Sequence, residues 1–215
     1  SIAFASQSGA LCTAVLDWAA TEGVGFSNVI SLGNMADMDE TDFLQLLAQD
    51  ENTRVILIYI EGIEDGRRFL EVAPEVSQRK PVVILKSGTS DAGAKAVASH
   101  TGSIAGSQVA YDAAFRRCGV LRAETIEELF NLGRAFSSQP VPQGRNVAIL
   151  TNAGGPSIVA ADACSRQDLN LAWLSPQTIG LLREKLPPEA SWTNPVDVLG
   201  DALADRYGLA LETLL

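Results

Sequence analysis

Four continuous apolar runs, separated by helix-like segments, constrain the fold of this chain more than any other feature. The runs read SIAFAS, FSNVISLG, RVILIYI and PVVILK, and they are too continuously apolar for strands that bury one face only. Apolar residues recur at three- and four-residue spacing in residues 9–22, 40–49 and 65–78, which is typical of helices with one buried face. The alternation predicts an α/β fold, with helices on both faces of a parallel, doubly wound sheet.

The same order of elements recurs after the segment SSQPVPQGR, whose prolines, glycine and polar residues indicate a linker. We therefore place a first domain at residues 1–138, a linker at 139–145 and the start of a second domain at 146–215. The elements expected in the second domain are a strand at 146–151, a helix at 156–167, a strand at 169–174, a helix at 176–186, a loop at 187–197 and a final helix. The first residues already read as a strand and the last as a helix without a stop signal, so we expect a longer parent chain and an incomplete second sheet.

The openings of the two domains resemble each other. IAFASQSGALCTAVLD aligns without gaps with VAILTNAGGPSIVAAD, and each consists of a strand, a glycine-containing turn and a helix. Many ordinary βα units open in this way, so the repeat alone is weak support for function. The small residues in the turns add to it, because they leave the positive end of each helix open to an anion. The candidate anion-binding residues are Ser6, Ser8, Gly9, Asn152, Gly154 and Gly155.

The composition limits which ligands the protein can bind and indicates the cell compartment. With 16 Lys and Arg against 26 Asp and Glu, the formal net charge is −10, which disfavours nucleic acid and anionic membranes as partners. The three cysteines show no disulfide or zinc-ligand spacing, which favours a cytoplasmic protein and gives no metal site. The acidic segment MADMDETDF lacks the positions of a calcium loop, and we expect it to contain a helix cap. For Lys86, contact with phosphate stays open, but we favour a solvated lysine at a strand end.

Glu61 and His100 are the candidate catalytic residues. Glu61 directly follows the run RVILIYI, and His100 is the only histidine of the chain, in the glycine- and serine-rich segment SHTGSIAGS. Ligands of parallel α/β sheets bind where the strands end, so both side chains should leave the sheet from that edge. A carboxylate on one ring nitrogen would orient an imidazole for nucleophilic attack by the other nitrogen.

Several blocks, in order, resemble the ADP-forming acyl-CoA synthetases, which are relatives of succinyl-CoA synthetase. They are SQSGAL, YIEGIEDGRRF, KPVVILKSGTSDAGAKAVASHTGSIAGS, YDAAFRRCGV, ILTNAGGPSIVAAD and NPVDVLGDA, and the resemblance extends over essentially the whole chain. It implies two flavodoxin-like (Rossmann-like) ligase domains. It also implies that His100 is phosphorylated by an acyl phosphate and passes the phosphoryl group to ADP, that Glu61 orients His100, and that the two turns hold the phosphate.

The resemblance also implies partners outside these residues. The substrates would be CoA and ATP or ADP, and the family's CoA-binding and ATP-grasp domains are expected in the same or a partner chain, with Mg²⁺ in the ATP-grasp domain and an oligomeric assembly. Two alternatives stay open at this point. The same architecture serves as a CoA-responsive regulatory module in related protein lysine acetyltransferases, and a flavodoxin-like fold can also bind ligands without any chemistry.

Overall fold

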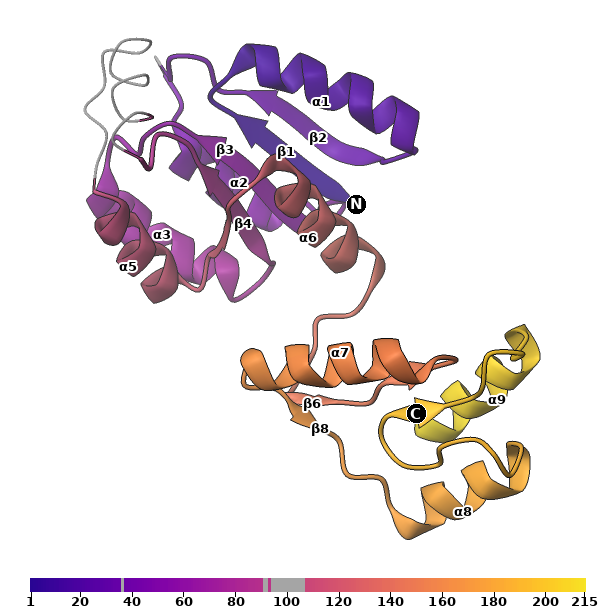
Figure 1. Cartoon of the computed structure of the whole chain (residues 1–215). Coiled ribbons are helices and arrows are strands. Elements are labelled where there is room, and N and C mark those ends of the chain that lie inside the picture. The colour runs from indigo at the N-terminus through magenta and orange to yellow at the C-terminus, as the bar shows by residue number, and fades with distance from the viewer. Residues whose placement is uncertain (36, 91–92, 94–106) are drawn as a thin grey trace. The chain divides into compact units, whose positions relative to one another are not determined.

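Two units, Ser1–Val141 and Pro142–Leu215, make up the chain, and each is built from parallel strands and helices (Figure 1). The structure is a computed structural model, and it describes residues 1–35, 37–90, 93 and 107–215. The candidate nucleophile His100 lies outside the described residues.

A five-stranded parallel sheet forms the centre of the first unit, which confirms the fold class that the apolar runs predict. Its strands are β1 (Ile2–Ser6), β2 (Phe26–Ser31), β3 (Val55–Ile60), β4 (Val82–Lys86) and β5 (Leu121–Ala123), in the spatial order β2-β1-β3-β4-β5. This is a doubly wound order, in which the chain moves first to one edge of the sheet and then to the other. Strands β1 and β4 are buried along their whole length, whereas β2, at the edge, is only partly buried.

Helices cover both faces of this sheet (Figure 1). On one face, α1 (Gly9–Glu22) and α6 (Ile126–Ser138) pack around Phe4 and Phe130, whose ring centroids are 5.5 Å apart. The other face is covered by α2 (Glu40–Gln49), α3 (Gly66–Ser77) and α5 (Gln108–Cys118). In the described part of the chain, no helix has both the length and the apolar character that crossing a membrane requires.

The second unit contains two short parallel strand pairs instead of one sheet. β6 (Asn146–Val147) pairs with β8 (Asn170–Leu171), and β7 (Leu150–Thr151) pairs with β9 (Val196–Asp197). Its helices are α7 (Gly154–Arg166), α8 (Pro176–Lys185) and α9 (Ala204–Leu214). The prediction of one strand at 146–151 was therefore wrong, because the segment changes partner halfway, and the expected loop at 187–197 contains the missed strand β9.

The side chain of Asn194 explains how the strand changes partner. Its Nδ2 donates to the carbonyl oxygens of Val147 (2.8 Å) and Ala172 (3.0 Å), and its Oδ1 accepts from the backbone N–H of Ile149 (3.0 Å). The N–H of Ile149 lies between the two strand pairs, whereas the carbonyl oxygen of Val147 also accepts from the backbone N–H of Ala172 at 2.8 Å, next to the β6–β8 pair. One amide side chain thus makes three hydrogen bonds to the backbone where the segment changes partner.

Replacing Asn194 by alanine should destabilise the second unit, because it removes three hydrogen bonds to partly buried backbone groups. We expect the free energy of unfolding to fall by about 3 kcal/mol, measured by urea denaturation with tryptophan fluorescence. Asn170→Ala is the matched control, since the exposed Asn170 side chain makes a long hydrogen bond of 3.4 Å to Asn146, and it should cost less than about 0.5 kcal/mol. Equal losses in both variants would show that Asn194 is not a structural bridge.

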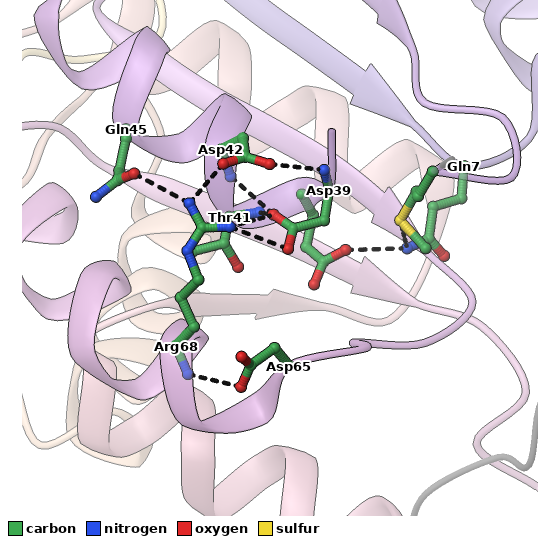
Figure 2. A network of polar contacts seen from close by, with 9 residues as sticks. Gln7, Asp39, Thr41, Asp42, Gln45, Asp65 and Arg68 are labelled. Atoms are coloured by element: carbon green, nitrogen blue, oxygen red, sulfur yellow. Dashed lines mark hydrogen bonds and ion pairs between the residues drawn. The ribbon is translucent and has the colours of Figure 1, made fainter. Parts of the chain in front are cut away.

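The acidic segment predicts a helix cap, and the structure shows a capping box at the start of α2 (Figure 2). The carboxylate of Asp39 accepts from the backbone N–H groups of Thr41 (2.8 Å) and Asp42 (2.9 Å), and Asp42 returns a bond to the N–H of Asp39 (2.9 Å). Arg68 of α3 pairs with Asp39 at 3.2 Å and with Asp42 at 2.5 Å, so the same carboxylates join α2 to α3. The first turn of α2 therefore has a fixed position beside the sheet.

Glu40, the first residue of α2, is buried, and few hydrogen bonds offset the cost of burying its carboxyl group. Its exposed fraction is 0%, its Oε1 has no hydrogen-bond partner among the described residues, and its Oε2 lies 3.5 Å from Nε2 of Gln7. Burial, together with the negative charges of Asp39 and Glu64, raises the pKa of Glu40 to about 7. The folded protein therefore holds this carboxyl group in its neutral form below that pH.

Glu40→Gln should stabilise the first unit in a pH-dependent way. Below about pH 4.5 the carboxyl group is neutral in both the folded and the unfolded wild type, so the two proteins should be similarly stable. As the pH rises from about 4.5 to about 7, the unfolded wild type ionises while the folded form does not, so only the wild type loses stability. Above this range the difference should level off on the order of 3 kcal/mol.

Urea denaturation at about pH 4, 6 and 8 measures this difference. Glu71→Gln, on the exposed side of α3, serves as the control and should change stability by less than about 0.5 kcal/mol at each pH. A stability gain for Glu40→Gln that is the same at every pH would contradict the assignment of a buried, neutral Glu40.

Candidate functional site

The carboxyl ends of β1, β3 and β4 meet at one edge of the first sheet. Ser6 pairs with Tyr59, and Ile60 pairs with Lys86, so the turns that follow these strands are neighbours. The candidate residues Ser6, Ser8, Gly9 and Glu61 all lie at this edge, as the sequence predicts. Such an edge collects the turns and helix starts that bind ligands in open parallel sheets.

The first turn, between β1 and α1, is closed by the hydroxyl of Ser6. Ser6 Oγ accepts from the backbone N–H of Ser8 (3.0 Å) and donates to its carbonyl oxygen (2.9 Å). Ser8 is the N-cap of α1, and its side chain accepts from the N–H of Leu11 at 3.4 Å. Gly9 is the first residue of the helix, so the turn presents small groups around the positive helix end.

The second turn, between β7 and α7, has the same hydrogen bonds at the aligned positions. Thr151 Oγ1 accepts from the N–H of Ala153 (3.1 Å) and donates to its carbonyl oxygen (3.2 Å). Asn152 lies within this turn, and α7 begins at Gly154, followed by Gly155. The ungapped alignment of the two openings thus corresponds to a shared local structure. The two turns belong to different units, and each is described within its own unit.

The two turns differ in how their helix starts are capped. Ser8 supplies a side-chain oxygen to α1, whereas Ala153, the N-cap of α7, has none to supply. The first N–H groups of α7 therefore depend on some other acceptor. A carboxylate is close, because a Cβ placed on Gly154 would lie 3.7 Å from Oδ2 of Asp197. The start of α7 is therefore the less satisfied of the two candidate anion sites.

The turn that carries Glu61 is held by residues that sequence reasoning missed. Gln7, in the first turn, accepts through Oε1 from the backbone N–H groups of Glu61 (2.5 Å) and Gly62 (3.2 Å), and its Nε2 donates to the carbonyl oxygen of Gly62 (2.8 Å). The hydroxyl of Tyr111 accepts from the N–H of Ile63 (3.2 Å). The only sequence signal for Gln7 was its place between the two candidate serines.

The prediction that Lys86 is a solvated lysine was wrong, because its side chain is buried. Its exposed fraction is 4%, its Nζ donates to the carbonyl oxygen of Ser87, and it lies 4.8 Å from the ring centroid of Tyr111. Burial lowers the pKa of Lys86, the charge of Glu61 opposes this, and Arg122 adds to the lowering. A buried cation therefore lies near the turn of the candidate carboxylate, and a strand-end position alone does not reveal this.

Metal and thiol chemistry find no support in the described residues. Within them, no group of three or more His, Cys, Asp or Glu side chains could hold a metal ion. Cys12, Cys118 and Cys164 are buried free thiols, and burial raises the pKa of Cys12 and Cys118, which makes these two thiols poorer nucleophiles. This edge of the sheet carries the carboxylate of Glu61, the buried Lys86 and the start of α1. A helix start and a nearby lysine are groups that can bind an anion.

Comparison with known proteins agrees with this fold. The first 136 residues match the family model described as the succinyl-CoA ligase like flavodoxin domain. The chain is 54% identical to acetate–CoA ligase (ADP-forming) I of Archaeoglobus fulgidus, over 99% of this chain and 31% of the relative. It is 49% identical to the alpha subunit of acetate–CoA ligase (ADP-forming) I of Pyrococcus furiosus, over 100% of this chain and 46% of that subunit.

A solved structure is similar over the same length. Acetyl-coenzyme A synthetase 1 of Ca. Korarchaeum cryptofilum, in complex with phosphate and ADP, matches with a TM-score of 0.92 and 40% identity, over 99% of this chain and 46% of that one. The chain thus spans about a third to a half of the length of these relatives. On the strength of its family match, its identity to these ligases and its sheet order, the chain belongs to the succinyl-CoA-ligase-like flavodoxin domain family.

Proposed function

We propose that this chain is part of an ADP-forming acyl-CoA ligase, an acid–thiol ligase that interconverts acyl-CoA, ADP and phosphate with a carboxylic acid, CoA and ATP. The observation that carries the proposal is the 54% identity, over 99% of the chain, to a protein named as an ADP-forming acetate–CoA ligase. The relatives reported above are ligases or their subunits, which favours this reading over a regulatory module of an acetyltransferase.

The rest of the machinery is proposed to lie outside these residues. The chain spans 31% and 46% of the two curated relatives, so their remaining length leaves room for the CoA-binding and ATP-grasp domains, in the same or a partner chain. Within this chain we propose domains at 1–138 and 146–215, joined by the linker 139–145. We place Mg²⁺ with the nucleotide in the ATP-grasp domain, and the assembled enzyme in the cytoplasm as an oligomer.

The proposed chemistry passes a phosphoryl group through His100. Inorganic phosphate attacks the thioester of acyl-CoA, the C–S bond breaks, and CoA leaves as the thiolate. A ring nitrogen of His100 then attacks the phosphorus of the acyl phosphate, a P–N bond forms, and the carboxylate leaves with the electron pair of the broken P–O bond. A terminal oxygen of ADP finally takes the phosphoryl group, and the P–N bond breaks.

The described residues support this chemistry in two ways. Glu61 lies at the sheet edge where β4, the strand that precedes His100 in the sequence, ends, so its carboxylate would hold the proton on the other ring nitrogen and fix the attacking tautomer. The turns at Ser6, Ser8 and Gly9 and at Asn152, Gly154 and Gly155 would receive the phosphoryl oxygens through backbone N–H groups. A phosphohistidine carries about two negative charges near neutral pH, which this acidic chain must offset locally.

His100→Asn should abolish phosphorylation of the complete enzyme. We expect the wild type, treated with γ-phosphate-labelled ATP and Mg²⁺, to take up a label that acid removes and base does not, and the variant to take up none. Glu64→Gln, an exposed carboxylate of the first unit, is the control and should be labelled like the wild type. Equal labelling of His100→Asn and wild type would refute the proposed function.

Glu61→Gln should slow phosphoryl transfer without unfolding the enzyme. The amide keeps the size of the side chain but cannot hold the imidazole proton as a carboxylate does, so the single-turnover labelling rate should fall by about 10²-fold or more. The melting temperature should stay within about 2 °C of the wild type, because Glu61 is tied to the fold through its backbone N–H. An unchanged labelling rate would remove Glu61 from the site.

A further inference from the structure

Gln7 connects the first anion-binding turn to the turn that carries Glu61. It lies between Ser6 and Ser8, and its backbone N–H donates to the carbonyl oxygen of Tyr59 (3.1 Å), which extends the β1–β3 ladder by one step. Its side chain then reaches past the end of β3. Gln7 thus belongs to the first turn through its backbone and contacts the Glu61 turn through its carboxamide.

The carboxamide of Gln7 forms hydrogen bonds with three backbone groups that have no partner in the sheet ladder. Oε1 accepts from the N–H groups of Glu61 (2.5 Å) and Gly62 (3.2 Å), while Nε2 donates to the carbonyl oxygen of Gly62 (2.8 Å). The adjacent N–H of Ile63 is taken by the hydroxyl of Tyr111. The Glu61 backbone therefore has its position fixed chiefly by Gln7, because β3 ends one residue earlier.

The surroundings allow only one orientation of this amide. Two N–H groups face one end, so that end must be the oxygen, and the nitrogen then faces acceptors. These are the carbonyl oxygen of Gly62, Sδ of Met35 at 3.2 Å and Oε2 of Glu40 at 3.5 Å; Figure 2 shows Gln7 reaching toward the start of α2. A carboxylate at position 7 would direct an oxygen at two of these acceptors, and a shorter side chain would not span the gap.

We propose that Gln7 is a positioning residue for Glu61: by holding the backbone of Glu61 and Gly62, it places the carboxylate relative to the first anion-binding turn, and it affects phosphoryl transfer only through Glu61. This inference rests on the proposed function. Glu40 supports the arrangement from α2, where its oxygen faces the amide nitrogen and the capping box fixes the helix start.

Hydrogen exchange tests the structural half of the proposal in the complete enzyme. In Gln7→Met, which keeps the length and loses the amide, the peptide covering residues 59–64 should exchange at least about 10-fold faster, while peptides from β1 and β4 keep their rates. Gln49→Met, at an exposed position of α2, should leave all three peptides unchanged. Unchanged exchange at residues 59–64 in Gln7→Met overturns the proposal.

Labelling kinetics test the functional half. Gln7→Met should lower the single-turnover phosphorylation rate of His100 by about 10- to 100-fold, with the ATP concentration for half-maximal rate unchanged, since misplacement by about 1 Å costs that much. In a Glu61→Gln background the same change should add no more than about twofold. Equal slowing in both backgrounds means that Gln7 acts independently of Glu61, and it overturns the proposal.

A second variant keeps the test decisive if Gln7→Met does not fold. Gln7→Glu keeps the length and can still accept from the two N–H groups, but it loses the donor to Gly62 and faces Glu40. It should therefore slow labelling less at low pH than at high pH, and Glu40→Gln should recover part of the loss by removing the neighbouring negative charge. Slowing that neither pH nor Glu40→Gln changes overturns the role given to the amide.

A wild type that takes up no label separates the two proposals. It contradicts the proposed function and, with it, the part of Gln7 in phosphoryl transfer. The exchange of residues 59–64 still decides whether Gln7 holds the Glu61 turn.

Discussion

The rest of this structure depends on one kind of interaction. Where the parallel strands end, side chains form hydrogen bonds with backbone groups that the sheet itself does not pair. At the ends of β1 and β7, the hydroxyls of Ser6 and Thr151 close the turns with the same pair of bonds. Gln7 binds the turn after β3, and Asn194 bridges the gap between the two strand pairs of the second unit. These bonds need no net charge, so they are available to shape the proposed anion sites of a chain whose formal charge is −10.

Two carboxyl groups close to Gln7 are placed in opposite environments. Glu61 is half-buried at the sheet edge, next to the end of β3. Glu40 is fully buried, and burial with nearby acidic residues raises its pKa to about 7. The neutral form of Glu40 spares the site another buried negative charge beside a proposed phosphoryl group. Lys86, buried near Glu61, adds a positive charge on the side of β4.

The unequal capping of the two helix starts has a consequence for the proposed phosphate site. In α1, the hydroxyl of Ser8 already takes one of the free N–H groups, at the long distance of 3.4 Å. In α7, Ala153 takes none, so more donors remain for a ligand, and the nearby carboxylate of Asp197 is the charge that an incoming phosphoryl group would meet. The matched turns thus share a backbone but would bind an anion with different strength.

The sequence alone was enough for the parallel fold of the first unit, its helices at 9–22, 40–49 and 65–78, a helix cap before α2, and the shared turn after β1 and β7. These features depend on local periodicity and on residues a few positions apart. The burial of Lys86 and Glu40, the clamp from Gln7 to Glu61, and the division of 146–151 into two strands were decided by the tertiary structure. Each brings together groups far apart in the chain, such as Gln7 and Gly62 or Asn194 and Val147, and the free energy of such contacts depends on packing that no local pattern encodes.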